Sequence, residues 1–272
     1  MVLLPWGTRS EQMSRSVGVV IPAYEPVVDS LVDYLHALHD HLDPATVRVE
    51  LDAPDASTVA ALEDEPCTVH AVDRRRGKGA AITCGFEALD TDVLAFADAD
   101  GATPAESIVD VVQPVVDGSA KLSVGSRRHP DANVLSHQTV ARRYLGDGFA
   151  FLARTLLSVP LYDFQCGAKA IDAEAWASVR DHLYEPGFAW DIELVAMAGA
   201  LGYEPVEVAV TWEDQPESTV SPVGTTLELG VSLLKSRHRM KRLQGSSLHR
   251  FVASRRSTSL SLVDRLGAET DE

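Results

Sequence analysis

The chain has 272 residues, is 45% hydrophobic and carries a formal net charge of −16. This length allows a large hydrophobic core in one domain, or in one domain with a tail. The chain contains no run of 18 apolar residues and residues 1–16 lack the apolar core of a signal peptide, so we expect neither a membrane span nor a leader. The acidic, lysine-poor composition argues against nonspecific nucleic-acid binding.

Two further features of the composition concern the environment of the protein. Its three cysteines, Cys67, Cys84 and Cys166, are widely spaced and form no CxxC pair. This spacing argues against a disulfide scaffold or a zinc site and favours a reducing compartment. The acidic composition also fits a protein that stays soluble in concentrated salt, which makes a halophilic origin a hypothesis.

The first half of the chain alternates predicted strands with predicted helices. Apolar runs bounded by turn signals predict strands, and apolar residues at helical spacing predict helices. This alternation predicts an α/β fold with a mostly parallel sheet flanked by helices, typical of nucleotide-binding proteins. The predicted strands lie at 17–22, 47–51, 67–72, 93–97 and 121–125, and the predicted helices begin near 28, 80 and 104.

The second half is less regular. It predicts long helices over 140–159 and 189–201 and one strand over 206–212. We therefore expect an N-terminal extension over 1–16, one catalytic or binding domain over 17–223, and an amphipathic, basic tail over 224–272.

Two aspartates follow the most apolar of the predicted strands. Asp98 and Asp100 end the run Val93–Gly101, and residues two apart in extended backbone point to the same side. Two convergent carboxylates at the carboxyl end of a strand suit Mg²⁺ or Mn²⁺, which often bridges to a phosphate. The alternative is an ordinary helix start at Gly101–Glu106, which leaves both aspartates unexplained.

A glycine-rich basic turn precedes these aspartates by one strand. The turn, Arg74-Arg75-Arg76-Gly77-Lys78-Gly79, joins a predicted strand to a predicted helix, where backbone amides and cations favour a phosphate. It lacks the spacing of a P-loop, and a solvated basic turn is the alternative. Asp52 ends another strand beside the same crevice, either to accept a hydrogen bond from a nucleoside or as an ordinary loop residue.

Six short motifs, taken together and in order, resemble the inverting GT-A glycosyltransferases of family 2. Within that family they are similar to the dolichyl-phosphate mannose and glucose synthases, and the resemblance extends over residues 17–221. The motifs are VVIPAYE (19–25), RGKGAA (76–81), FADADG (96–101), VGSR (124–127), DFQCGAKA (163–170) and GFAWDIEL (187–194).

The resemblance implies roles for individual residues at the donor end. Asp98 and Asp100 would hold the metal and the donor diphosphate, which the basic turn also contacts. Asp52 matches the first aspartate of a base-binding turn, but the turn reads Asp-Ala-Pro-Asp here rather than Asp-Asp-Gly-Ser. Ala102 replaces a glutamine that completes the metal shell in some members. The other residues implied to bind the donor are Pro22, Tyr24, Glu25, Arg76, Gly77 and Lys78.

At the acceptor end, the resemblance implies that Arg127 and Arg143, or its neighbour Arg142, clamp a phosphate. Without the resemblance, the two helical arginines could equally form a solvated face. Gln165 would line the sugar pocket. Asp191 would orient the sugar hydroxyls or act as a base, and its alternative role is that of an acidic residue at a helix N-terminus.

The resemblance implies an inverting transfer of a hexose from a UDP- or GDP-sugar to dolichyl or polyprenyl phosphate, feeding glycan assembly such as protein N-glycosylation. A lipid monophosphate is already largely ionised near neutral pH, so it needs positioning more than deprotonation. The alternatives are a soluble acceptor and a nucleotide-sugar-binding protein without turnover. The intact Asp98 and Asp100 argue against the latter.

The last part of the sequence suits a lipid acceptor. No Asp or Glu occurs over 229–263, where eight Lys and Arg residues follow Leu229, Leu233 and Leu234. Such a tail fits the surface of an anionic membrane, and we expect a peripheral protein at the cytoplasmic face. A disordered basic tail, or a tail that contacts the acidic body of the protein, is equally compatible.

Overall fold

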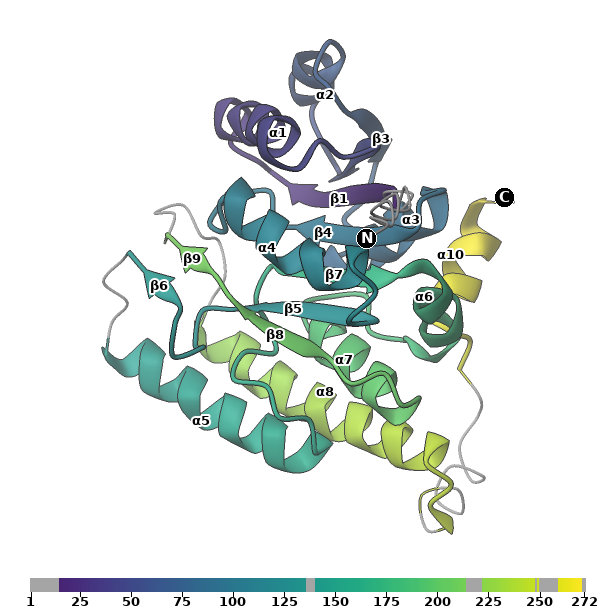
Figure 1. Cartoon of the computed structure of the whole chain (residues 1–272). Helices are drawn as coiled ribbons and strands as arrows, with labels where there is room; N and C mark the ends of the chain where they lie inside the picture. Colours follow the sequence, from purple (N-terminus) through teal and green to yellow (C-terminus); the bar gives the residue numbers. More distant parts are fainter. Residues whose placement is uncertain (1–14, 136–139, 214–221, 248, 250–258, 271–272) are drawn as a thin grey trace, which may run out of the picture.

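A seven-stranded sheet forms the centre of the computed structural model (Figure 1). The structure describes residues 15–135, 140–213, 222–247, 249 and 259–270, without the side chains of 140–145, 222–228 and 269–270. The strand order is β3-β2-β1-β4-β7-β5-β8, and β6 pairs with β9 in a separate ribbon. The strands are β1 Val17–Tyr24, β2 Thr46–Asp52, β3 Thr68–Val72, β4 Val93–Ala97, β5 Leu122–Ser126, β6 Asn133–Val134, β7 Ala168–Asp172, β8 Val206–Ala209 and β9 Thr211–Trp212.

The sheet is mostly parallel, as expected, and β7 is its antiparallel member, pairing with both β4 and β5. The strand order reverses between β1 and β4. These two strands pair only from Val17↔Val93 to Val20↔Phe96, while β1 continues to Tyr24 beside β2. A reversal of this kind opens a crevice at the carboxyl ends of the strands, where ligands bind in open α/β sheets.

Helices cover both faces of the sheet and produce two cores. Val19 and Ile21 of β1 pack with α1 and α4, whereas Val20 packs on the other side. That second core contains residues of α3, α5, α6, α7, α8 and α10. The helices are α1 Val28–Leu42, α2 Ala56–Leu62, α3 Lys78–Ala88, α4 Ala105–Val116, α5 Val140–Leu157, α6 Ala173–Val179, α7 Trp190–Ala200, α8 Pro222–Leu243 and α10 Leu262–Thr270, with the 3-10 helix η1 Arg180–His182.

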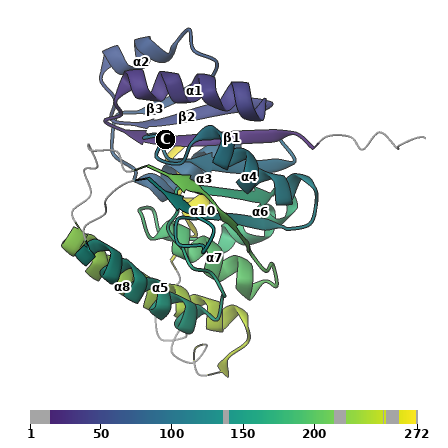
Figure 2. The ribbon, with the colours of Figure 1, turned by 60° about the vertical axis from the view of Figure 1, so that its left-hand side comes forward.

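The C-terminal part of the chain belongs to the folded body. Helix α8 packs against α7 and lies alongside α5 (Figures 1 and 2). Leu229 and Leu233 of α8 are buried in the core, so the prediction that both face a membrane is wrong. Helix α10 returns to contact α3 and η1, and the Leu262 amide donates a hydrogen bond to the Leu183 carbonyl at 2.7 Å.

Several elements differ from their predictions. The strand expected over 206–212 is divided into β8, in the main sheet, and β9, in the ribbon. Helices α2, α6 and α10 and strand β7 were not predicted. None of the described helices is both long enough and apolar enough to cross a membrane.

Candidate active site

Asp98 and Asp100 lie at the carboxyl end of β4, beside the crevice. Asp98 continues from the strand, and its amide donates a hydrogen bond to the Gly167 carbonyl at 3.0 Å. A Cβ atom on Gly167 would lie 2.0 Å from Oδ2 of Asp98. Only glycine therefore leaves room for the observed Asp98 side chain.

The Asp100 carboxylate accepts a hydrogen bond from the Ala102 amide at 3.0 Å. Partial burial of the carboxyl group and the nearby Asp98 charge raise the pKa of Asp100. A bound cation would offset the repulsion between these two neighbouring carboxyl groups. A hydrogen bond fixes the loop that follows: the buried Tyr34 hydroxyl donates to the Thr103 carbonyl at 2.8 Å.

A chain of alternating charges leads from Asp98 into the protein. Lys78, the first residue of α3, places Nζ 2.8 Å from Oδ1 of Asp98 and 3.4 Å from Oδ2 of Asp191. The other oxygen of Asp191 accepts a hydrogen bond from Lys169 at 2.5 Å, and Lys169 also donates to the Cys166 carbonyl at 2.8 Å. Burial disfavours the charge on Lys78, but Asp191 and Asp98 outweigh it and raise the pKa of Lys78.

Asp191 is therefore engaged by two ammonium groups. Its side chain is only 2% exposed, at the start of α7. Asp191 lies in the first turn of α7, as expected for an acidic residue at a helix N-terminus. The ion pairs, however, favour a role in holding Lys78 over a role as a base, because each carboxylate oxygen of Asp191 is already engaged by an ammonium group.

The glycine-rich turn is organised by Asp52, at the end of β2. The Asp52 carboxylate accepts hydrogen bonds from the Arg76 amide at 2.7 Å, the Gly77 amide at 2.9 Å and Nε of Arg76 at 2.7 Å. The expectation that Arg76 and these amides face a phosphate does not describe the structure, because Asp52 already occupies them. Lys78, the next residue, is the cation that the turn presents to the crevice.

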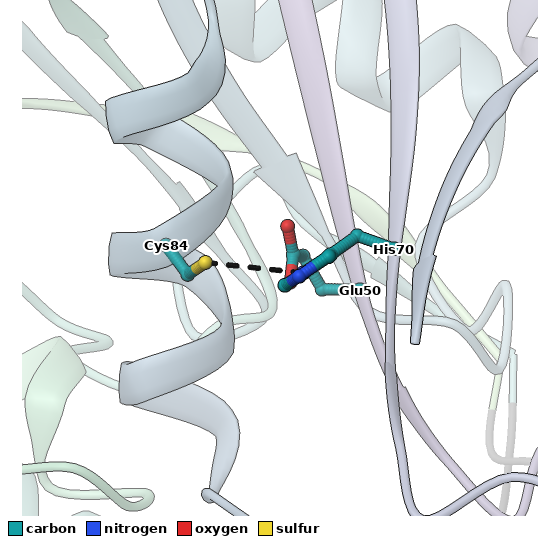
Figure 3. A group of neighbouring side chains, drawn as sticks. All are labelled: Glu50, His70 and Cys84. Atoms are coloured by element: carbon teal, nitrogen blue, oxygen red, sulfur yellow. Dashed lines mark hydrogen bonds and ion pairs between the residues drawn. The ribbon is translucent and has the colours of Figure 1, made fainter. Parts of the chain in front are cut away.

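Arg76 also joins this turn to a cluster on β2, β3 and α3. Glu50, His70 and Cys84 bring potential metal ligands within 4.8 Å of one another (Figure 3). The Glu50 carboxylate, however, already pairs with Nε of Arg48 at 2.6 Å and Nη2 of Arg76 at 3.0 Å. Two guanidinium groups oppose a further cation there, so we assign the cluster to fixing Arg76 rather than to a metal.

Arg127 follows β5 and forms a two-point ion pair with Asp163. Its Nε and Nη2 lie 2.7 and 3.0 Å from the two Asp163 oxygens. Burial opposes the negative charge, but Arg127 outweighs it and lowers the pKa of Asp163 well below its usual range. Glu207 of β8 fixes this loop by accepting hydrogen bonds from the Tyr162 and Asp163 amides at 2.8 Å. The backbone N–H of the half-buried Gln165 donates a hydrogen bond to Oδ1 of Asp163 at 3.0 Å.

The remaining predicted residues divide into two groups. Pro22, Tyr24 and Glu25 lie at the end of β1 or just beyond it, and the Arg75 guanidinium stacks 4.0 Å from the centre of the Tyr24 ring. Arg142 and Arg143 lie in the first turns of α5, but their side chains fall outside the described residues.

Two charged residues of the site were not predicted to have a role there. Asp163 and Lys169 both lie within the motif 163–170, yet neither was assigned a partner. The spacing of the motif gives no indication that Asp163 meets Arg127, or that Lys169 meets Asp191 from a different element.

Comparison with known proteins identifies the family. The sequence profile of Glycosyl transferase family 2 matches residues 18–175, more than half of the chain. The chain belongs to glycosyl transferase family 2. It is therefore a glycosyltransferase, and the matched region contains β1, the glycine-rich turn, both crevice aspartates and β7.

Two similar proteins have related names. Glycosyltransferase AglD from Haloferax volcanii is 29% identical over 230 residues, which cover 81% of this chain and 36% of AglD. The dolichyl-phosphate beta-glucosyltransferase of Mus musculus is 29% identical over 250 residues, covering 84% of this chain and 76% of the mouse protein. The chain thus spans about a third of AglD and about three quarters of the mouse enzyme.

Solved structures share the fold. A glucosyl-3-phosphoglycerate synthase from Mycobacterium tuberculosis, crystallised with UDP, gives a TM-score of 0.62 at 21% identity, covering 87% of this chain and 86% of that one. A mannosyl-3-phosphoglycerate synthase from Rubrobacter xylanophilus also gives a TM-score of 0.62, at 16% identity, with 85% and 75% covered. These likenesses support the GT-A architecture predicted from the sequence.

Proposed function

We propose that this family 2 glycosyltransferase moves a hexose from a nucleoside-diphosphate sugar to a dolichyl or polyprenyl phosphate with inversion at the anomeric carbon. The observation that carries the proposal is the placement of Asp98, Asp100 and Lys78 around one crevice. Relatives named dolichyl-phosphate beta-glucosyltransferase support the acceptor and favour glucose as the sugar. The product would supply a lipid-linked sugar for glycan assembly, such as protein N-glycosylation.

The residues at the end of β4 fit a divalent cation, Mg²⁺ or Mn²⁺. Asp98 and Asp100 offer hard oxygen ligands, and Gly167 keeps space beside Asp98 that any side chain would fill. When bound, the cation would neutralise charge that builds on the departing diphosphate. Glucosyl-3-phosphoglycerate synthase has been crystallised with Mn²⁺ and UDP, which supports the same class of metal here.

The protein's own groups have the chemistry that the donor requires. Lys78 can shift from Asp98 to the diphosphate because its four-carbon side chain is flexible and its ammonium group is held, but not enclosed, by carboxylates. Tyr24, Glu25 and Pro22 would line the nucleoside end of the crevice. Asp52 would contribute indirectly, by fixing the turn that carries Lys78. The side chains that line the nucleoside end of the crevice would determine the preference for UDP or GDP.

At the acceptor end, a phosphate oxygen of the lipid attacks the anomeric carbon, the bond from that carbon to the diphosphate breaks, and the nucleoside diphosphate leaves. The acceptor is already ionised, so no general base is needed. Arg127 would orient the acceptor through donors beyond those that Asp163 uses, with Arg142 or Arg143 of α5 facing the same phosphate. Gln165 would contact the sugar and Asp191 would hold Lys78.

A lipid acceptor requires contact with a membrane, and α5 and α8 provide a suitable surface. These adjacent helices expose apolar side chains, and the described part of 229–263 adds basic ones. Phosphates of anionic lipids attract such cations by about 1 kcal/mol each near the surface. We therefore propose peripheral attachment at the cytoplasmic face through the α5–α8 face, defined by Phe151, Leu152, Val231 and Leu234.

The decisive experiment incubates the protein with dolichyl phosphate, Mn²⁺ and radiolabelled UDP- and GDP-sugars, one sugar per reaction. Radioactivity that moves into the organic phase identifies donor and acceptor together. We expect transfer from UDP-glucose that ceases in EDTA. No transfer from any donor, in reactions where a known dolichyl-phosphate glucosyltransferase is active, would overturn the proposal.

A soluble phosphorylated acceptor is the second candidate. It is favoured by the fold shared with synthases whose names specify 3-phosphoglycerate. Including 3-phosphoglycerate in the same assay separates the two candidates, because its product remains in the aqueous phase.

A further inference from the structure

Lys169 is a lysine whose charged side chain is buried inside the protein. It lies on β7, in the interior of the sheet, and its side chain is 1% exposed. Lysine is almost never buried to this extent without a partner. Its ammonium group lies 5.5 Å from the centre of the Phe96 ring, and Lys78 lies 5.1 Å from the same ring. The two ammonium groups thus lie near the same aromatic ring and contact the same carboxylate, that of Asp191.

Charge balance indicates what Lys169 does. Asp191 attracts both lysines, at 2.5 Å and 3.4 Å, so the longer contact with Lys78 is the weaker of the two. Counting these two lysines with Asp98, Asp100 and Asp191 gives a net charge of −1. Without Lys169 the same groups would carry −2, and Asp191 would have Lys78 as its sole ionic partner among them.

We propose that Lys169 is a positioning residue that neutralises Asp191 and so leaves Lys78 available to the donor diphosphate. This inference rests on the proposed function, since it takes Asp98 and Asp100 as the metal site and Lys78 as a diphosphate contact. Lys169 touches neither ligand. It acts through Asp191, by deciding how strongly Asp191 holds Lys78.

The proposal predicts opposite effects on two ligands when Lys169 becomes Met, which keeps the length and removes the charge. UDP and GDP, titrated by calorimetry in EDTA, should bind about tenfold more weakly, because the site is more negative and Lys78 is drawn toward Asp191. Mn²⁺, titrated by electron paramagnetic resonance without nucleotide, should bind Asp98 and Asp100 equally or more tightly. A general loss of structure would weaken both.

Two further variants complete the test. Lys169→Met with Asp191→Asn restores the net charge of −1 and should recover nucleotide affinity to within about threefold of the wild type. It also removes the unbalanced buried carboxylate, so it remains informative should the single variant fail to fold. Lys121→Met is the matched control. Lys121 pairs with Asp172 at the opposite end of β7, and its loss should leave both affinities unchanged.

The outcomes separate the two proposals. Wild-type protein that binds neither nucleotide even when Mn²⁺ is present, or Mn²⁺ binding that survives loss of both Asp98 and Asp100, overturns the proposed function. With those results as expected, the role of Lys169 is overturned by unchanged nucleotide affinity in Lys169→Met. It is also overturned when both ligands weaken together and the double variant recovers neither.

Discussion

The two aspartates at the end of β4 carry the chemistry at the scale of single residues. Replacing Asp98 or Asp100 by Asn keeps the shape and removes a negative ligand. We expect each variant to lose at least about 100-fold in sugar transfer, since the departing diphosphate would lack the cation. A radiolabel transfer assay measures the loss, and thermal unfolding checks that the fold persists. A fully active double variant would refute the metal assignment.

A second prediction at this scale concerns space rather than charge. Gly167→Ala would place a methyl group 2.0 Å from Oδ2 of Asp98, so the carboxylate must move. We expect Mn²⁺ affinity to fall severalfold while the protein remains folded. Gly148→Ala, on α5, is the matched control, because a Cβ atom there meets nothing within 4 Å. Equal Mn²⁺ affinity in both variants would show that Asp98 does not need its observed position.

The sequence indicated Asp98 and Asp100 correctly as the end of a buried strand because both signals are local: an apolar run, then two carboxylates at alternate positions. The partners of other residues are not local. Asp52 meets Arg76 and Gly77 from another strand, and Asp163 meets Arg127 across 36 positions. Charged residues could be identified from sequence, but which of them neutralise each other depends on the packing of the sheet.

At the scale of elements, one buried carboxylate links α8 to α7 in addition to their apolar packing. Glu193 of α7 accepts hydrogen bonds from the Tyr184 and Glu185 amides, at 2.6 and 2.8 Å, and pairs with Arg239 of α8. Burial raises the pKa of Glu193, although Arg239 and the two amides oppose the shift and the Glu185 charge adds to it. Lys235 of α8 reaches Glu185 from the same side, at 3.5 Å.

We therefore expect Arg239→Met to destabilise the protein by about 3 kcal/mol at pH 8, because it leaves Glu193 charged and unpaired. The folded-state pKa of Glu193 would rise further above its unfolded value. The cost is then greatest above that pKa and is relieved as the pH falls through it. Chemical denaturation at pH 8 and pH 5 should show the smaller loss at pH 5, and Glu193→Gln should rescue the variant. A loss independent of pH would contradict this account.

The outer face of α8 is the subject of a further prediction. Val231 and Leu234 are 56% and 59% exposed, so charges there should leave the fold intact. We expect Val231→Glu with Leu234→Glu to reduce sedimentation with anionic liposomes at least about fivefold, since apolar contact and attraction to cations both decrease. Leu201→Glu, at an exposed leucine that follows α7 and is not part of the α5–α8 face, is the control. Equal sedimentation of the two would remove the α5–α8 face from the proposal.

The elements themselves were predictable to different degrees. Strands such as β4, an uninterrupted apolar run, are evident in the sequence. β7 is not, because Lys169 interrupts its apolar pattern and its antiparallel position follows from contacts with β4 and β5. Helix α8 was predicted as a tail outside the domain, whereas it packs into the folded body. Its buried Leu229 and Leu233 and its exposed Val231 and Leu234 form one amphipathic pattern that satisfies a protein core on one side.

For the whole molecule, the distribution of charge affects folding stability and membrane attachment in different ways. The net charge is −16, whereas residues 229–263 contain no acidic side chain. Self-repulsion of the acidic body destabilises the folded state at low ionic strength, and salt screens it over a Debye length of about 10 Å at 0.1 M. The same salt weakens the attraction between the basic residues of α8 and anionic lipid. High salt should therefore favour folding while leaving membrane attachment more dependent on apolar contact.

This opposition gives the final prediction. Between about 0.1 M and about 2 M KCl, the midpoint of thermal unfolding should rise by several degrees, because screening removes repulsion among acidic side chains. Liposome binding by the wild type should fall only in part over that range, and binding by the Val231→Glu, Leu234→Glu variant should vanish.

A matched variant that replaces exposed acids with amides should flatten the response of the midpoint; suitable positions are Asp29, Asp33, Asp40, Glu63 and Asp64. Full activity in low salt with loss in molar salt would contradict the halophilic hypothesis.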